Sequence, residues 1–471
     1  MTPAARPWLT LTLAAAAWGF TAGCGALPAR HAEVQPLGAQ AANEKVTMQG
    51  RRGPVSASVQ AGDLAKLRAE GQGALVQRQL GVLAAAGDVD LYRGNTARLL
   101  VDGPATFAAM KTAIASARKR VLLESYIIEK GEVANEFAAL LLRKAAEGVH
   151  VALLYDSVGS MGSDKDYFDR LRAGGVAVCA YNPVNPLERP GHWSVIQRNH
   201  RKMLAVDSDI AYTGGINLSD VYASGSGPGS GSGSGGKTGS DEEGWRDTQV
   251  ELRGPVVNAM AVVFRESWAG QGCPGALPPA PPPRQATSGE RVIKLVAGDP
   301  RAGVNPTYQA LIKAVDASVR SVHLTMAYFA PGKEMVQALS DAAARGVDVQ
   351  MVLPGRSDVK LVLAASRSHY AQLLKAGVRI HEFQGAVMHA KTAVIDGVFS
   401  SVGSSNLDWR SILVNHEIDV IVLGDDFGQE LEALFQRDVK ASRPIDAQGW
   451  QQRGLWQRFT EGVARLLEPL L

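Results

Sequence analysis

The chain has 471 residues, of which 46% are hydrophobic, and its formal net charge is +3. That length suggests two or three domains with a sizeable core, and a charge so near zero gives no indication of a nucleic-acid partner. The three cysteines, Cys24, Cys179 and Cys273, have no spacing typical of a zinc site or a disulfide framework. Cys179 lies in the apolar run VAVCAY, which predicts a core position.

The N-terminal segment contains an apolar run over residues 8–20, followed by Ala22-Gly23-Cys24. Its length suits a signal peptide better than a membrane-spanning helix, and the rest of the chain has no run of 18 or more apolar residues. Ala22-Gly23-Cys24 resembles a bacterial lipoprotein cleavage site with Cys24 as the lipid carrier, although Thr21 stands where Leu is usual. Ordinary cleavage and an uncleaved anchor are the alternatives. All three predict a bacterial cell-envelope protein associated with a membrane, the inner membrane being favoured.

An internal duplication begins at Ala97 and again at Arg291. Each copy predicts a strand, an amphipathic helix, an apolar strand ending in a tyrosine (Tyr126 and Tyr328), a second helix and a second apolar strand. Strands that alternate with helices predict βαβ units. We therefore expect an α/β fold whose sheets are mainly parallel and covered on both faces.

Segments of different composition separate and flank the two copies. Residues 25–95 predict a polar lead-in with one helix over about residues 63–86, and the Gly/Ser-rich residues 224–240 predict a flexible loop. The Pro-rich stretch between the copies is typical of a linker. The predicted boundaries are 1–24 for the signal or lipoprotein-like segment, 25–95 for the lead-in, 96–270 for repeat 1, 271–290 for the linker, 291–445 for repeat 2 and 446–471 for a C-terminal helix.

That C-terminal helix is amphipathic. Its apolar positions recur at helical spacing, and polar or charged residues lie between them. Tryptophan near one end favours a membrane interface, whereas a helix packed on its own domain is the alternative. The apolar positions are Leu455, Trp456, Phe459, Val463, Leu466, Leu467 and Leu470.

Both copies contain one motif with the same internal spacing. The first reads His200-Arg-Lys202-(x4)-Asp207-(x6)-Gly214-Gly215-Ile-Asn217, and the second reads His389-Ala-Lys391-(x4)-Asp396-(x6)-Gly403-Ser404-Ser-Asn406. A single histidine on an apolar strand is usually structural. The match at equivalent places in two copies makes a shared catalytic role the favoured interpretation.

The spacing of the motif explains what it can do. Alternate residues of a strand face the same side, so His389 and Lys391 are expected to project together. Asp396 and the glycine after it predict a hairpin turn, and the returning strand brings Ser404 and Asn406 back beside the pair. Small residues let backbone N–H groups approach a phosphate, and the Asn amide adds a donor. Two copies supply the two imidazoles that a double displacement requires.

Four acids accompany the motif. Asp207 and Asp396 fall at predicted turns, where Asp is common for local hydrogen bonding, so we expect a structural or electrostatic role for them within the catalytic motif. Asp247 and Glu417 precede equivalent apolar strands, and a buried carboxylate on imidazole Nδ1 would orient the ring. Ordinary surface acids are the alternative. No carboxylate–histidine cluster has metal-ligand spacing, so no metal and no other cofactor is predicted.

The duplicated motif resembles that of the phospholipase D superfamily, over about residues 97–471. Within it, the chain is most similar to bacterial cardiolipin synthases, on the evidence of four further segments. These are Ala327-Tyr328-Phe329-Ala330-Pro331, the Trp-Arg-Asp-Thr segment containing Asp247, Asn415-x-Glu417, and Ala464-Arg-Leu-Leu-Glu-Pro-Leu-Leu471. The resemblance implies two α/β repeats around a pseudo-twofold axis with one shared active site. Gly215, where the second copy has Ser404, departs from the symmetry and puts a hydroxyl contact in doubt on one side.

The resemblance implies a phosphatidyltransferase that makes cardiolipin and glycerol from two phosphatidylglycerols through a phosphohistidine. One of His200 and His389 would attack phosphorus and the other would protonate the leaving alcohol. Phosphate oxygens would be held by Lys202, Lys391, Asn217, Asn406 and Ser404. A phospholipase D-type hydrolase, less favourably a nuclease, would use the same site with water as acceptor, and a lipid-binding protein with a degenerate site is a third alternative. Phospholipid substrates and a membrane surface are the expected partners. The oligomeric state is not predicted.

Overall fold

The computed structural model describes residues 36–471, apart from residues 70, 86, 227–243 and 283–288. The signal or lipoprotein-like segment with Cys24, and most of the predicted Gly/Ser loop, lie outside the described residues. Among the helices that the structure does describe, none is both long enough and apolar enough to span a bilayer.

Repeat 1 is a seven-stranded sheet in the spatial order β6-β5-β4-β8-β9-β10-β3. The helices α5, α6 and α7 share one hydrophobic core with its strands, and α8 shares another. The elements are β3 (Val89–Val101), α5 (Asp102–Ala115), β4 (Arg120–Ser125), α6 (Glu132–Ala146), β5 (His150–Asp156), α7 (Lys165–Ala173), β6 (Ala177–Tyr181), β7 (Arg198–Asn199), β8 (Met203–Val206), β9 (Ile210–Gly214), β10 (Thr248–Arg253) and α8 (Val256–Gly270).

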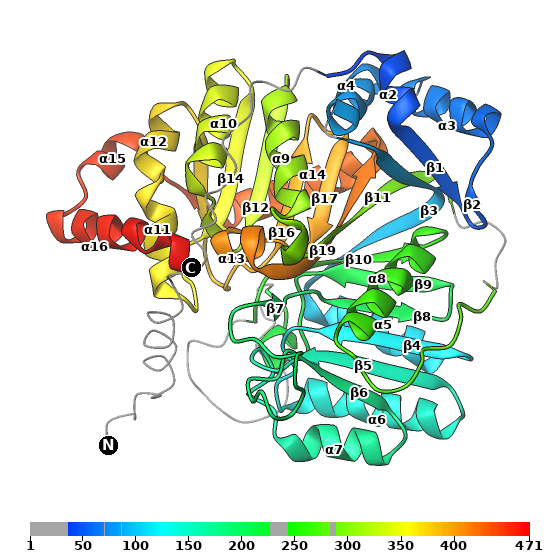
Figure 1. The fold of residues 1–471 in the computed structure, drawn as a ribbon. Coiled ribbons are helices and arrows are strands. Elements are labelled where there is room, and N and C mark those ends of the chain that lie inside the picture. The colour runs from blue at the N-terminus through cyan, green and yellow to red at the C-terminus, as the bar shows by residue number, and fades with distance from the viewer. Residues whose placement is uncertain (1–35, 70, 86, 227–243, 283–288) are drawn as a thin grey trace, which may run out of the picture.

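Repeat 2 has the same strand order, β15-β14-β12-β16-β17-β19-β11. Its main elements are β11 (Arg291–Gly298), α9 (Pro306–Ala317), β12 (Ser321–Met326), α10 (Gly332–Ala344), β14 (Asp348–Pro354), α11 (Lys360–Ser368), α12 (Tyr370–Lys375), β15 (Arg379–Phe383), β16 (Lys391–Ile395), β17 (Phe399–Gly403), α13 (Trp409–Leu413), β19 (Asn415–Leu423) and α14 (Asp425–Lys440). The duplicated α/β architecture is thereby confirmed (Figure 1).

Strand direction divides each repeat in two. The βαβ strands β4, β5 and β6 are parallel, as are β12, β14 and β15. The other strands of each seven-stranded set pair antiparallel, because each motif forms a hairpin followed by a return strand. The sheet is therefore mixed, with the parallel pairing in the βαβ units where the sequence predicted it.

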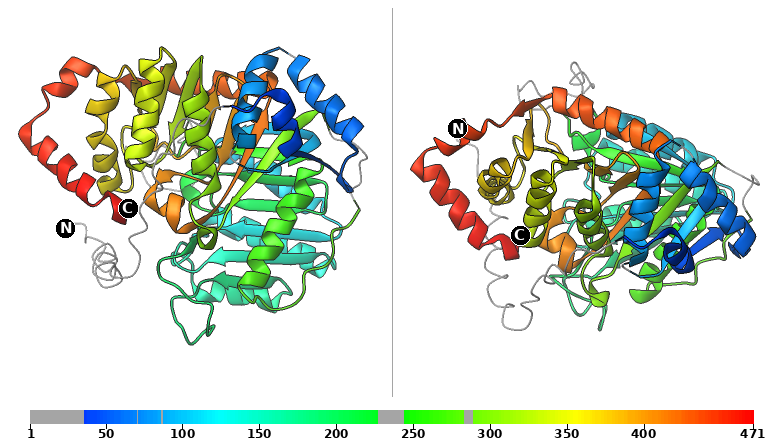
Figure 2. Two further views of the ribbon diagram at one scale, coloured as in Figure 1. Left: turned by 45° about the horizontal axis from the view of Figure 1, so that its top comes forward. Right: turned by 90° about the horizontal axis from the view of Figure 1, so that it is seen from above.

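The two repeats share one sheet and one of the hydrophobic clusters. Strand β3 pairs with β10 along its second half and with β11 near its middle, so it joins the two halves. Helices α8 and α14 lie in one hydrophobic cluster with strands of both repeats, including Phe264 and Phe427, which are fully buried. Figure 2 shows the two lobes from further directions. This arrangement holds the two motif hairpins in a fixed relation.

The lead-in contains more structure than the sequence predicted. The single helix expected over about residues 63–86 is wrong, because two helices, α3 (Ala57–Ala69) and α4 (Gly73–Ala85), occupy this region. Gly71 lies between them with φ of +44°, a conformation that ends a helix. A strand, β1 (Val46–Gly50), pairs with β3, and Leu80 of α4 belongs to the core of repeat 2. The lead-in is therefore part of the same folded body as the two repeats.

The cysteine prediction also needs correction. Cys179 is buried, as expected for a core residue, but it forms a disulfide with Cys273, 94 residues away. Cys179 lies on β6 and Cys273 follows α8, so only the fold brings them together. The bond ties the start of the inter-repeat connection to the outer strand of repeat 1.

The chain ends in a short strand and two helices, β20 (Ser442–Pro444), α15 (Ala447–Gln451) and α16 (Leu455–Leu466), followed by one turn, η3 (Glu468–Leu470). Helix α16 packs on α11 of repeat 2, where Ala464 meets Ala365. The predicted apolar positions of α16 face outward: Leu455 is 83% exposed and Trp456 is 75% exposed. This helix is therefore not packed on its domain through its apolar face.

Candidate active site

Two hairpins carry the motif residues. Lys202 immediately precedes β8 and Lys391 is the first residue of β16, and the hairpins β8–β9 and β16–β17 follow the predicted turns. His200 donates its backbone N–H to the carbonyl of His416, 2.9 Å away in repeat 2. His389 donates its backbone N–H to Arg246 of repeat 1 at 2.7 Å. Each histidine is thus held against the opposite repeat.

The orienting carboxylates cross between the repeats. Nδ1 of His200 lies 3.0 Å from both carboxylate oxygens of Glu417, which belongs to repeat 2. Nδ1 of His389 lies 2.7 Å from Oδ2 of Asp247, which belongs to repeat 1. When Nδ1–H donates to the carboxylate, Nε2 keeps its lone pair and can attack an electrophile. Neither half of the site is complete without the other repeat.

The departure from symmetry at Gly215 has a steric cause. A Cβ at Gly215 would lie 2.2 Å from Oδ1 of Asp247, so this half-site requires glycine. In the other half, Glu417 is one methylene longer, and Ser404 donates its hydroxyl to Glu417 at 2.5 Å. The half-site with the shorter acid, Asp247, therefore has Gly215, and the half-site with the longer acid, Glu417, has Ser404. The hydroxyl of Ser404, predicted to contact phosphate, is used by Glu417 instead.

The lysines bring buried positive charge to the histidines. Burial lowers the pKa of Lys202 to about 7, with Lys391 lowering it further while Glu417 opposes the shift. Burial likewise lowers the pKa of Lys391 to about 8. Burial raises the pKa of Glu417 to about 7. Two cations and two carboxylates, counting Asp247, sum to zero, which allows four ionisable groups to be buried together.

The two predicted asparagines differ in their contacts. Asn406 is buried, and its Oδ1, an acceptor, has no hydrogen-bond partner among the described residues. Asn217 accepts from the backbone N–H of Ile127 at 3.1 Å and donates to the hydroxyl of Tyr222 at 3.2 Å. Asn217 therefore holds Ile127 and Tyr222 in place, in addition to any contact with substrate.

Asp207 and Asp396 lie at the turns of the two hairpins, both with φ of +54°. Asp207 accepts backbone N–H groups from Lys119 at 2.9 Å and Arg120 at 3.0 Å. Asp396 accepts likewise from Arg320 at 2.8 Å, and Gln79 of the lead-in donates to it. These contacts give both aspartates the structural role that the sequence favoured, because each ties a hairpin turn to the start of a central strand.

Aromatic residues surround the histidines. The ring of Tyr126 lies edge-on to His200 at 4.8 Å, and Lys202 Nζ lies 5.1 Å from the Tyr126 ring centroid. Trp245 lies 5.1 Å from the ring of His389 and Tyr328 lies 6.1 Å from it. These rings exclude water from the imidazoles and strengthen electrostatic interactions there.

Tyr222 and Ser411 were missed in the sequence. The hydroxyl of Tyr222 lies 3.2 Å from Nδ1 of His389, and Ser411 donates its hydroxyl to Glu417 at 2.7 Å. Each follows the motif asparagine of its own repeat by five residues. That shared offset was the available signal, although the residue types differ.

Two arginines form hydrogen bonds between the two repeats. Arg201 of the first motif donates to the backbone carbonyls of Glu417 at 3.1 Å and Gly298 at 2.8 Å, both in repeat 2. Arg246 of repeat 1 forms a bidentate pair with Asp438 of α14, at 2.9 and 2.8 Å. Because bidentate arginine pairs fix geometry, these contacts hold the crossed histidine–carboxylate pairs in register.

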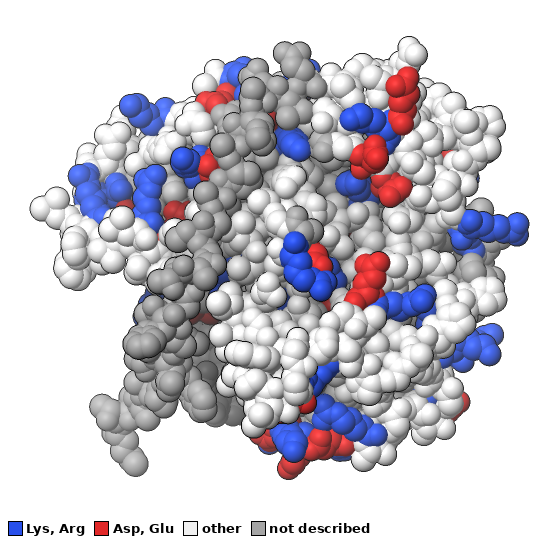
Figure 3. Space-filling model, in the orientation of Figure 1, with Lys and Arg blue, Asp and Glu red and all other residues white. Residues whose placement is uncertain are grey.

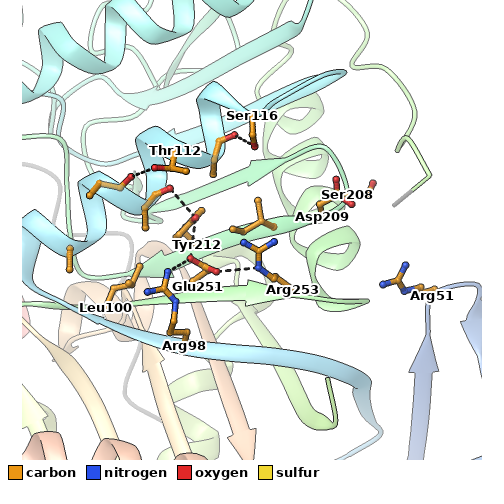
Figure 4. A pocket seen from close by; sticks show the side chains of 15 residues that line it. Arg51, Arg98, Leu100, Thr112, Ser116, Ser208, Asp209, Tyr212, Glu251 and Arg253 are labelled. Atoms are coloured by element: carbon orange, nitrogen blue, oxygen red, sulfur yellow. Dashed lines mark hydrogen bonds and ion pairs between the residues drawn. The ribbon is translucent and has the colours of Figure 1, made fainter. Parts of the chain in front are cut away.

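A separate groove of about 590 Å³ lies between α5 and strands β3, β9 and β10 (Figure 4). Its Glu251 accepts from Arg98 at 2.5 Å and from Arg253 at 3.2 Å. The named motif positions do not line this groove, although Ser208, Asp209, Ile210 and Tyr212, which lie between Asp207 and Gly214 of the first motif, do.

The fold and the paired motifs define a two-repeat phospholipase D-like protein. A family model described as "Cardiolipin synthase, PLD-like domain" matches residues 110–224 and 311–439. A cardiolipin synthase of Geobacillus thermodenitrificans is 34% identical over 378 residues, covering 79% of this chain and 72% of that protein. Cardiolipin synthase A of Pseudomonas fluorescens is 34% identical over 388 residues, covering 82% and 77%. The chain belongs to the cardiolipin synthase family.

A solved structure supports the fold independently. The phosphatidylserine synthase of Haemophilus influenzae matches with a TM-score of 0.58 at 12% identity, covering 80% of this chain and 95% of that one. At that identity the likeness shows the shared fold alone.

Proposed function

We propose that this enzyme is a phosphatidyltransferase that converts two phosphatidylglycerols into cardiolipin and glycerol. One observation carries the proposal: two buried histidines, each oriented through Nδ1 by a carboxylate from the opposite repeat, stand among two buried lysines. A double displacement at phosphorus needs one imidazole as nucleophile and another as proton carrier. The relatives of this chain point to cardiolipin as the product.

The first displacement uses both half-sites. Nε2 of one histidine attacks phosphorus, a P–N bond forms, and the P–O bond to glycerol breaks as the other histidine donates its proton to the departing oxygen. Lys202 and Lys391 neutralise the charge on the non-bridging oxygens. Before substrate binds, the two lysines and the two carboxylates together carry no net charge. An incoming phosphodiester anion therefore favours protonation of one imidazole. Substrate binding thereby favours the protonated imidazole that acts as the general acid.

The second displacement reverses the proton transfer. The histidine that lost its proton removes one from a hydroxyl of the second phosphatidylglycerol, whose oxygen attacks phosphorus as the P–N bond breaks. Aromatic rings at Tyr126, Trp245 and Tyr328 keep water from competing. Asn406 adds a donor on the phosphoryl oxygens, and Asp207 and Asp396 hold the hairpins that carry the motif.

Product analysis tests the proposal. Purified protein would be incubated with vesicles of labelled phosphatidylglycerol, and cardiolipin, phosphatidic acid and free glycerol would be separated and counted. We expect cardiolipin and glycerol in equal amounts, and neither product from the His389→Ala variant. Phosphatidic acid as the main product would replace the transferase with a hydrolase of the same site.

Two features support a location in the cell envelope. Phospholipid substrates require access to a membrane surface, and residues 1–24 supply a signal or lipoprotein-like segment. The disulfide between Cys179 and Cys273 is of a kind that persists in oxidising compartments and is rare in the bacterial cytosol. We therefore propose that the catalytic body lies in the cell envelope, on the extracytoplasmic side of the inner membrane.

A further inference from the structure

Helix α16 presents its apolar side to solvent. Leu455, Trp456 and Leu466 are 83%, 75% and 81% exposed, whereas Glu461 and Ala464 are buried. A surface helix of a globular protein normally turns its apolar stripe inward. Here the polar side is inside, so the exposed stripe forms a patch larger than scattered surface residues would give.

The outward orientation is built into the packing. Glu461 accepts from Arg453 and from Gln457, both at 2.9 Å, so its burial is compensated. After the helix, Glu468 accepts from the backbone N–H of Gly332 at 2.9 Å and lies 3.0 Å from Nε2 of His369. The C-terminal end of α16 is thus fixed to repeat 2, and Ala464 packs against Ala365 of α11, which holds the polar side of the helix inward.

A second apolar patch belongs to repeat 1. In the segment between β6 and β7, Leu187 is 85% exposed, and Trp193, Val195 and Ile196 are each about half exposed. The segment is held at its base by Arg189, which donates to Ala180 at 2.7 Å beside the disulfide. It leads directly into His200, four residues beyond Ile196.

Arg410 connects the two patches at the active site. Its backbone N–H donates to Leu471 at 3.2 Å, and its guanidinium donates to the carbonyl of Ile196 at 3.4 Å. Burial is the main cause of the lowered pKa of His200, and the positive charge of Arg410 is among those that lower it further. In Figure 1, α16 and the coil before β7 flank the C-terminus from two sides. Arg410 therefore joins the two patches within electrostatic reach of His200.

We propose that the apolar side of α16 and the segment 183–197 form one docking surface for an anionic phospholipid bilayer. This rests on the proposed function, because a phosphatidyl group can reach the histidines while its acyl chains remain in the bilayer only if the site opens at the membrane. Exposed Arg458 and Arg465 on α16 complement anionic headgroups. The left end of the molecule in Figure 3, where α16 lies, shows uncharged side chains bordered by Lys and Arg.

Charge-introducing pairs test the surface in the full-length protein. Trp456→Glu with Leu466→Glu alters α16, and Leu187→Glu with Trp193→Glu alters the segment. Val262→Glu, on α8 and 46% exposed, is the matched control. Co-sedimentation with phosphatidylglycerol and phosphatidylcholine vesicles measures binding. We expect each pair to weaken binding to phosphatidylglycerol vesicles by roughly tenfold or more, and the control to stay within about twofold.

A soluble substrate separates the docking surface from the chemistry. Dihexanoyl phosphatidylglycerol below its micelle concentration should be turned over equally by wild type and both pairs, whereas turnover on vesicles should fall with binding. Unchanged vesicle binding by both pairs would overturn the docking surface even if cardiolipin is made. Loss of binding in both pairs, with no lipid product from wild type, would overturn the proposed function and leave the surface standing.

Two other occupants of the docking surface would give different experimental results. If a second copy covers α16, the Trp456→Glu/Leu466→Glu pair will shift the sedimentation velocity toward a smaller species without weakening vesicle binding. If residues 1–35 provide the attachment, their deletion will abolish vesicle binding while both pairs retain it. Either result would overturn the proposal.

Discussion

Exchanging Glu417 tests the crossed half-sites most directly. Glu417→Gln keeps the size of the side chain and removes its charge. The amide no longer favours the tautomer of His200 that carries its hydrogen on Nδ1. A hydrogen bond to a charged group contributes about 1.5–3 kcal/mol, which corresponds to roughly a 10- to 150-fold loss of kcat. The imidazole can also adopt the wrong tautomer, which makes the loss larger. We expect a fall of about 10² to 10⁴ on vesicles of phosphatidylglycerol, with little change in KM.

The two half-sites supply a matched control. Glu417→Asp shortens the carboxylate by one methylene and should cost nearly as much as the amide. Glu417→Asp combined with Ser404→Gly recreates the Asp247–Gly215 arrangement of the other half, so activity should recover by about tenfold or more. In the reverse direction, Gly215→Ser should inactivate, because its Cβ would lie 2.2 Å from Asp247. A double variant no better than Glu417→Asp alone would refute the steric reasoning.

Three further predictions concern the site and its support. His200→Ala and His389→Ala should each remove nearly all cardiolipin synthesis, and the double variant should be no worse, as measured by product formation. In the free enzyme kcat/KM should fall as pH rises through about 7, where Lys202 loses its proton, and bound phosphate should move the fall in kcat to higher pH. Cys273→Ser should lower the thermal midpoint, because the bond from Cys179 closes a long loop worth about 4–5 kcal/mol; an unchanged midpoint would count against the disulfide.

The sequence was sufficient for features that repeat within the chain. The spacing of His200 and Lys202 with Asn217, matched in repeat 2, predicted the motif hairpins and the strand that returns beside the His/Lys pair. Hydrophobic runs predicted the βαβ units because buried parallel strands are apolar throughout. The position of Asp207 at a turn also predicted its structural role, since Asp at a turn accepts neighbouring N–H groups.

Features that depend on distant pairing were not predictable in this way. The Cys179–Cys273 bond joins positions 94 residues apart, and nothing in their spacing signals it. The hydroxyl of Ser404 could be directed to phosphate or to Glu417, and only the fold decides. Amphipathic spacing showed that α16 has an apolar side but not which way it faces, because that depends on the burial of Glu461 and Ala464.

Crossed pairing gives a physical reason for one active site per duplicated chain. His200 takes its carboxylate from repeat 2 and His389 takes its carboxylate from repeat 1, so a separated repeat would hold an imidazole without its partner and a buried acid without its base. Leaving such an acid uncompensated is strongly destabilising. Arg201 and Arg246 add contacts across the same boundary. The groups that orient the histidines therefore also hold the repeats together, and small shifts between the lobes should reduce catalysis before they unfold the chain.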